Sequence, residues 1–186
     1  ETLVGPPSLV LDIGCNDGTL LSYYHCDTPK FGVDPSDIGA EVNLPNTTVI
    51  RDLFPSPELS KQLGERRFDL ITAIAMFYDL ESPVDFCKGI AQCLSANGLW
   101  AFEMSYMPSM LKKCSYDTIC HEHLEYYSLA VIERVLASAE MKLVRAELNE
   151  SNGGSIRCYA THQNCFDYKN IEWARKISEL REQEFE

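Results

Sequence analysis

Apolar residues gather in short runs along the first half of the chain, with amphipathic stretches between them. The runs occupy residues 9–13, 30–34, 47–50, 68–76 and 99–104, and glycine, proline or charged residues bound them. Apolar residues recur at helical spacing after Pro83, and a shorter helix is expected over residues 20–25. Buried strands that alternate with helices are typical of a parallel sheet with crossover connections. The sequence therefore predicts a doubly wound, Rossmann-like α/β fold.

The second half of the chain adds an antiparallel edge to this sheet. Residues 141–148 and 155–161 resemble two further strands, and the turn at Asn152-Gly153-Gly154 suits a hairpin. Between the two halves, Ser128 can cap a helix whose apolar side chains form one stripe. We therefore expect a mainly parallel sheet with an antiparallel hairpin at one edge.

A last helical pattern begins near Tyr168 and carries apolar residues that we expect to dock on a neighbour outside this sequence. The chain starts at Glu1 rather than at a methionine, and it stops within this charged helical pattern. We therefore expect a core domain over residues 1–165 and a terminal helix over residues 166–186. Other domains of a longer polypeptide are then its expected partners.

Composition and charge limit the classes of partner. The formal net charge of −12 leaves no cationic surface to replace the counterions of a nucleic acid, and it disfavours anionic membranes. No apolar run approaches the roughly 20 residues that span a bilayer. The eight cysteines include no C-x-x-C pair and lie mostly in apolar segments, so we expect reduced thiols and a cytoplasmic protein. Small or neutral molecules are the expected ligands.

Residues 10–21, VLDIGCNDGTLL, join a predicted strand, a glycine loop and a helix start. Gly14 and Gly18 allow a tight turn, and a helix N-terminus offers free N–H groups to a ligand. A dinucleotide fold needs further glycines in this loop and holds a dianionic pyrophosphate over it. Here Asn16 interrupts that pattern, while Asp12 and Asp17 would repel a pyrophosphate and attract an ammonium or sulfonium group. The loop therefore predicts S-adenosylmethionine (SAM), which leaves as S-adenosylhomocysteine; a nicotinamide-dependent oxidoreductase is the alternative.

Acidic residues follow the second and third predicted strands. Asp34 can accept hydrogen bonds from the ribose hydroxyls, and Asp52 is placed to meet the adenine amino group. Alternatively, Asp34 is a turn residue and Asp52 a helix cap, but their register with the glycine loop favours the cofactor. Further residues expected at the cofactor are Cys15, Pro35, Leu53, Phe54, Ala75 and Met76.

The run from Val10 to Thr161 resembles the class I SAM-dependent methyltransferases. Tyr116 to Leu129, YDTICHEHLEYYSL, followed by NGGS at Asn152 to Ser155, is similar to the sugar methyltransferases typified by nucleotide-sugar C-methyltransferases. The resemblance implies a carbohydrate acceptor, with His123 as the proton acceptor and Glu122 beside it. In that family a cysteine-rich zinc-binding domain precedes this core and a large domain follows it.

Methyl transfer from a sulfonium needs a nucleophile that is losing its proton, and a neutral imidazole can take that proton near pH 7. On an extended H-x-H segment, His121 and His123 would point the same way, so that one is the base and the other binds the acceptor. Residues expected at the acceptor are Tyr78, Asp79, Tyr106, Tyr116, Tyr126 and Asn152. A metal site of Cys114, Cys120, His121 and His123 is an alternative, but its irregular spacing fixes no geometry, and we predict no metal.

The chain departs from the sugar methyltransferase pattern at two places. Asp79 ends the segment where the family reads N-V-L-x-H, and Cys120 stands where the family has a tyrosine before HEH. C-methylation needs a stabilised enolate, for which the missing histidine and tyrosine are plausible helpers, whereas O-methylation needs only a base and positioning. We therefore favour a sugar hydroxyl as the acceptor, with C-methylation of a keto sugar as the alternative. A non-catalytic module of a glycan-building protein is a third hypothesis, against which the intact HEH argues.

Overall fold

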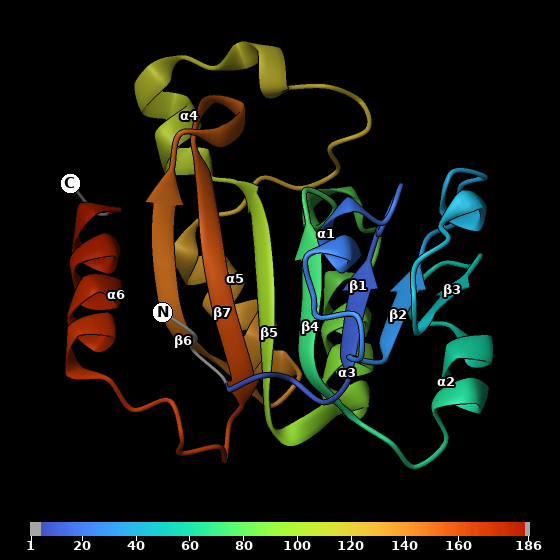
Figure 1. Cartoon of the computed structure of the whole chain (residues 1–186). Helices are drawn as coiled ribbons and strands as arrows, with labels where there is room; N and C mark the ends of the chain where they lie inside the picture. The colour runs from blue at the N-terminus through green and yellow to red at the C-terminus, as the bar shows by residue number, and fades with distance from the viewer. Residues whose placement is uncertain (1–4, 185–186) are drawn as a thin grey trace.

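The computed structural model describes residues 5–184, which are organised around one seven-stranded sheet of order β3-β2-β1-β4-β5-β7-β6 (Figure 1). The strands are β1 (Val10–Ile13), β2 (Lys30–Val33), β3 (Thr47–Ile50), β4 (Phe68–Ile74), β5 (Leu94–Ser105), β6 (Met141–Asn149) and β7 (Ser155–His162). The first five strands pair in parallel, and β7 runs antiparallel to both β5 and β6. The predicted parallel sheet and its antiparallel edge hairpin are confirmed.

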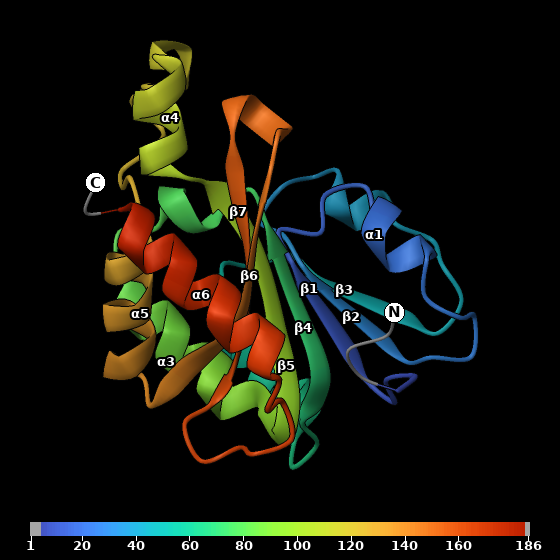
Figure 2. The same cartoon turned by 90° about the vertical axis from the view of Figure 1, so that its left-hand side faces the viewer.

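Helices cover the two faces of this sheet unequally. In Figure 2, α3 (Pro83–Cys93), α5 (Leu129–Ser138) and α6 (Ile171–Gln183) lie on one side, and α1 (Thr19–Ser22) lies on the other. The remaining helices are α2 (Pro57–Leu63) and α4 (Met107–Lys113), together with the short 3-10 turns η1 (Gly39–Glu41), η2 (Phe77–Asp79), η3 (Tyr116–Thr118) and η4 (Ser151–Gly153). None of the helices in residues 5–184 combines the length and hydropathy needed to cross a membrane.

An aromatic cluster fills the core between the sheet and the α3–α5 layer. The rings of Trp100 and Phe102, both on β5, stack with their centroids 4.0 Å apart. Phe77 packs its ring against both and against Tyr127, at centroid distances of 5.7, 5.4 and 5.2 Å. Because Phe77 is the first residue of η2, this cluster fixes the turn that follows β4. The side chains of the next two residues, Tyr78 and Asp79, are thereby placed at the carboxyl end of the sheet.

The structure differs from the sequence prediction in three elements. The helix expected over residues 20–25 is a single turn that ends at Ser22. The strand expected over residues 99–104 begins earlier, at Leu94, so that Asn97-Gly98, which has the composition of a turn, lies inside β5, where the pairing with β4 shifts register. The carbonyl of Gly98 remains paired there, because it accepts the Thr161 hydroxyl at 2.7 Å. The third difference is the segment 105–127, for which no helix was predicted and which contains α4 and η3.

Helix α6 packs part of its apolar side within the domain, while Ile171 at its start is 90% exposed. Ile177 is buried, and the Arg145 guanidinium on β6 lies 5.3 Å from the ring centroid of Trp173. Just beyond the helix, Glu184 accepts the Tyr106 hydroxyl at 2.6 Å and the backbone N–H of Leu129. The terminal helix is therefore tied both to the sheet edge and to the start of α5.

Candidate active site

The glycine loop between β1 and α1 turns through backbone conformations that favour glycine. Gly14, Asn16 and Gly18 have φ values of 71°, 48° and 76°, all in the left-handed region. Gly14 donates its N–H to the Val33 carbonyl at 2.8 Å, which holds the loop against the end of β2. A Cβ on Gly18 would lie 2.8 Å from Val42 Cγ1. Both predicted glycines are thus required by the path of the chain.

Asp34 fastens this loop to the end of β2. One of its carboxylate oxygens accepts the Asn16 N–H at 2.9 Å, and the other accepts the N–H and the hydroxyl of Ser36 at 2.9 and 2.5 Å. Burial raises the pKa of Asp34, but these hydrogen bonds outweigh it and hold the pKa below its usual value. A carboxylate has about four acceptor positions, so about one is left for a ligand. Pro35 directly follows this anchor.

Asp12 lies at the floor of a cavity of about 490 Å³ beside the glycine loop. The Thr72 hydroxyl on β4 donates to its Oδ1 at 2.6 Å. Burial raises the pKa of Asp12 to about 6, against the opposing effect of the Thr72 hydrogen bond and with a smaller contribution from Asp34. Gly14, Cys15 and Ile74 also line this cavity. The cavity therefore holds an acidic group that changes its charge near neutral pH.

The residues after β4 meet the glycine loop. Ala75 has a φ of 56° and donates its N–H to the Glu103 carbonyl at 2.9 Å. Met76 lies close enough that a Cβ on Gly14 would be 3.5 Å from its Cγ. Met76 therefore adjoins the loop, and Ala75 is hydrogen-bonded to the end of β5; a role of both at the cofactor stays a prediction.

The residues after β3 are only partly placed as expected. Asp52 uses its carboxylate locally, accepting the Leu53 N–H at 2.8 Å and the Ser56 hydroxyl at 2.7 Å. Phe54 turns its ring toward α3, where its centroid lies 5.0 Å from that of Phe86. Leu53 is 70% exposed. Of this group, Leu53 offers a free apolar surface to a ligand, and Phe54 belongs to the core.

The H-x-H segment is a turn rather than an extended strand, so its two histidines do not point the same way. The side chain of His121 is 92% exposed, and its Nε2 lies 3.8 Å from a carboxylate oxygen of Glu122. His123 instead packs on Tyr78, with ring centroids 4.2 Å apart, and its Nδ1 is buried without a hydrogen-bond partner. The expectation that the two imidazoles point the same way was wrong. The Tyr78 carbonyl accepts the N–H groups of Leu124 and Glu125, and these hydrogen bonds turn the segment back onto η2.

Asp79 belongs to the same cluster as His123. Burial raises the pKa of Asp79, while the charge of His123 lowers it and that of Glu122 raises it. Tyr126 stands on the other side of His123, with ring centroids 6.4 Å apart. The structure thus gathers an imidazole, a carboxyl group and two phenol rings, at the end of η2.

Three other residues expected at the acceptor lie outside the cluster around His123. Tyr106 is buried and bonded to Glu184, so it supports the fold instead of binding an acceptor. Asn152 sits in the left-handed region at the tip of the β6–β7 hairpin, on the turn that approaches α4. Tyr116 is 81% exposed on η3. These positions were predicted from a motif, which does not specify which side chains the tertiary fold turns inward.

Two polar residues of the site escaped the sequence analysis. Thr72 binds Asp12, and Ser36 binds Asp34. Thr72 carried a usable signal, because it interrupts the otherwise apolar middle of β4, FDLITAI. Ser36 carried none, since a serine after Pro35 is ordinary turn chemistry.

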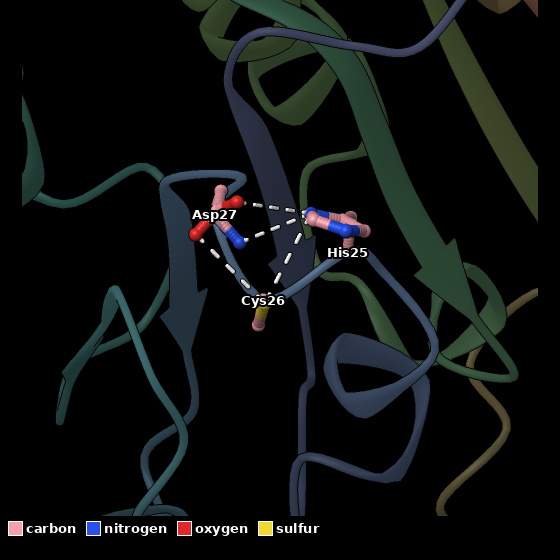
Figure 3. A group of neighbouring side chains, drawn as sticks. All are labelled: His25, Cys26 and Asp27. Carbon is pink, nitrogen blue, oxygen red and sulfur yellow. Dashed lines mark hydrogen bonds and ion pairs between the residues drawn. The ribbon is translucent and has the colours of Figure 1, made fainter.

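His25, Cys26 and Asp27 form a separate group of possible ligands, shown in Figure 3. All three are exposed on the connection from α1 to β2, and the His25 Nδ1 accepts the Asp27 N–H at 3.3 Å within that turn. In the described part of the chain this is the one group of its kind, so Cys114, Cys120 and the two histidines of HEH do not come together as a metal set. The group precedes β2, whose opposite end adjoins the glycine loop.

Comparison with known proteins agrees with this arrangement. The C-methyltransferase NovU of Streptomyces niveus is 27% identical over 156 residues, which are 82% of this chain and 37% of NovU. Among solved structures, the plantazolicin methyltransferase BpumL, in complex with a triazolic desmethylPZN analogue and S-adenosylhomocysteine, has a TM-score of 0.61 at 15% identity, over 85% of this chain and 78% of that one. CalO1, a methyltransferase in calicheamicin biosynthesis in its S-adenosylhomocysteine-bound form, has a TM-score of 0.64 at 13% identity, over 86% and 50% of the two chains.

These likenesses share the fold predicted here, and the product bound in both structures is that of the cofactor expected from the glycine loop. The methyltransferase domain family model matches residues 4–146, which is most of the chain. The chain therefore belongs to the methyltransferase domain family.

Proposed function

We propose that this methyltransferase transfers the methyl group of SAM to a hydroxyl group of a carbohydrate, a deoxysugar or a glycan. The observation that carries the proposal is the path of residues 75–79. Met76 adjoins Gly14 of the glycine loop, and two residues later Tyr78 contacts His123. A cofactor at the loop and an acceptor at His123 would therefore meet across η2, the short turn that Phe77 holds in the aromatic cluster.

The residues present fit SAM. The loop opens onto a cavity of about 490 Å³, and Asp34 keeps about one acceptor position for the ribose. Asp12 offers a carboxyl group to the ammonium group of the methionine part, and a nearby cation would favour its charged form. Dense negative charge at Asp12, Asp17 and Asp34 disfavours a pyrophosphate at the same place, which argues against a nicotinamide cofactor.

His123 is the proposed general base. As the hydroxyl oxygen attacks the methyl carbon, the carbon–sulfur bond breaks and the hydroxyl proton passes to the imidazole. The Tyr78 ring, tilted against the imidazole at a centroid distance of 4.2 Å, fixes the orientation of His123, and Asp79 lies in the same cluster. The similarity of the HEH run to sugar methyltransferases supports a carbohydrate acceptor.

C-methylation of a keto sugar is the second candidate, favoured by the similarity to NovU, which is named a C-methyltransferase. O-methylation is preferred because Asp79 and Cys120 replace the histidine and tyrosine of the sugar methyltransferase pattern. NMR of the product made with methyl-labelled SAM decides between them. A methyl signal on a ring carbon would replace the preferred proposal with the second candidate.

The role of His123 is tested by His123→Ala, with His121→Ala as a matched control of the same residue type on the same turn. We expect His123→Ala to lower kcat by about 10²–10⁴-fold with little change in S-adenosylhomocysteine affinity, because the lost group acts on the acceptor proton. His121→Ala should keep kcat and change at most the acceptor KM. A folded His123→Ala protein with normal kcat would remove His123 from the mechanism.

A further inference from the structure

A second cavity, of about 420 Å³, lies between α4 and the segment that follows it. Met107, Met110 and Leu111 line it from α4, and Tyr116, Ile119 and Tyr126 line it from the other side. No charged side chain lines this cavity, and Ser115 and Cys114 are its other members. It shares no lining residue with the cavity at Asp12. We call it the α4 cavity.

The α4 cavity shares a wall with the proposed base. Tyr126 lines the cavity and also flanks His123, at a ring-centroid distance of 6.4 Å. The cavity and the surroundings of the imidazole therefore have the Tyr126 ring in common. In Figure 1 the segment after α4 arches over the carboxyl ends of β5 and β4, where the acceptor must approach the cofactor. The α4 cavity thus adjoins the path of the acceptor.

The chemistry of the lining selects an apolar occupant. A diphosphate needs cationic or N–H donors. Of the two lysines in the last turn of α4, Lys113 is paired with Glu150 and Lys112 lines a different cavity. Tyr116 and Ile119 are 81% and 66% exposed, so a ligand that covered them would gain from the hydrophobic effect. A dry apolar cavity of about 150 Å³ accepts one benzene ring, so the α4 cavity has room for two or three rings.

We propose that the α4 cavity binds an apolar aglycone of two or three fused rings, attached to the sugar whose hydroxyl group is methylated. This inference rests on the proposed function, because it takes a sugar hydroxyl to be at His123. It specifies the acceptor as a glycoside with a ring-system aglycone instead of a free sugar or a sugar nucleotide. The aglycone supplies binding energy beside the reacting group and orients the hydroxyl toward the imidazole.

The test compares the 2-naphthyl and methyl glycosides of the same 6-deoxysugar, titrated by calorimetry into the protein saturated with S-adenosylhomocysteine. We expect the naphthyl glycoside to bind at least about tenfold more tightly, from the apolar area that it buries. Ile119→Asp places a charge in the cavity and should reduce this preference to within about threefold. Ile171→Asp is the matched control, because Ile171 is 90% exposed at the start of α6 and lies outside the cavity. The control should keep the full preference.

The outcomes separate the cavity from the reaction. Equal binding of the two glycosides, or a naphthyl preference that survives in Ile119→Asp, overturns the α4 cavity as an aglycone site. An Ile119-dependent preference without methyl transfer keeps the aglycone site and refutes the sugar hydroxyl as acceptor. Sedimentation supplies the remaining check: a dimer that Ile119→Asp converts to monomers would show that a second copy covers this face, and the proposal would fail.

Discussion

Removal of the Asp34 carboxylate tests the cofactor site most directly, because that one group serves both the loop and the expected ribose. In the structure it accepts the N–H of Asn16 and both donors of Ser36. Asp34→Ala takes away all three bonds and the acceptor position left for a ligand. The glycine loop then loses its tie to the end of β2, so the variant should bind SAM more weakly for two reasons that act together.

The magnitude follows from the acceptor position that remains. About one charge-assisted hydrogen bond from the ribose is available, and such bonds contribute about 1.5–3 kcal/mol. A tenfold change in affinity corresponds to about 1.4 kcal/mol, so the expected loss is roughly 10- to 150-fold. Loosening of Asn16 adds to this range. Asp34→Asn keeps the shape but not the charge, so its loss should be smaller than that of the alanine variant.

Calorimetry with S-adenosylhomocysteine measures this loss, and circular dichroism confirms that each variant is folded. Asp37→Ala is the matched control. It removes the same charge three residues after Asp34, where Asp37 forms an exposed ion pair with Arg51. We expect the control to bind like the wild type. If Asp34→Ala bound S-adenosylhomocysteine as tightly as Asp37→Ala, Asp34 would hold no part of the ligand. The cofactor would then have to be placed elsewhere on the sheet edge.

Three further variants test single features of the fold and the site. Gly18→Ala should lower the free energy of unfolding in urea by at least about 1–2 kcal/mol, because φ is 76° and Val42 leaves no room for a Cβ. Asp12→Asn should stabilise the protein without cofactor at pH 7 and should weaken SAM binding. Burial raises the pKa of Asp12 to about 6, so the stability contributed by its protonated form is present below about pH 4 and is lost as the pH rises through about 6. Equal free energies of unfolding of the wild type and Asp12→Asn at pH 7 would refute this effect. Glu184→Ala should lower the melting temperature by several degrees, because Tyr106 and the first turn of α5 lose their acceptor, and an unchanged value would show that this link is not structural.

The sheet could be predicted from the sequence because its strands coincide with short apolar runs that can be recognised locally. The apolar runs at β1, β4 and β5 are buried on both faces or nearly so, and a run of that kind cannot lie on the surface. The Asn152-Gly153-Gly154 turn likewise marks the edge hairpin. The boundaries of single elements were predicted less well. Asn97-Gly98 has the composition of a turn, yet β5 passes through it because pairing with β4 outweighs the local preference.

The cofactor half of the site could be predicted for a related reason. Gly14, Gly18 and Asp34 stand at strand ends, so the topology of a parallel sheet brings them together whatever the side chains around them do. The acceptor half depends on long-range packing instead. His123 is turned onto η2 by hydrogen bonds to the Tyr78 carbonyl, a contact between residues far apart in the sequence. No local pattern in HEH encodes it.

The difference between the cofactor half and the acceptor half of the candidate site also bears on the choice of acceptor. The segment between α4 and α5 joins the rest of the fold through a few backbone contacts, among them the two N–H groups that the Tyr78 carbonyl accepts. Tyr127 and His123 of this segment pack on η2, but its exposed side chains, such as Tyr116 and Ile119, can vary without disturbing the sheet, the glycine loop or η2. A connecting segment of this kind can change the acceptor while the cofactor site stays the same. If the α4 cavity binds the aglycone as proposed, the exposed Tyr116 and Ile119 on that segment, and not residues of the sheet, select the acceptor.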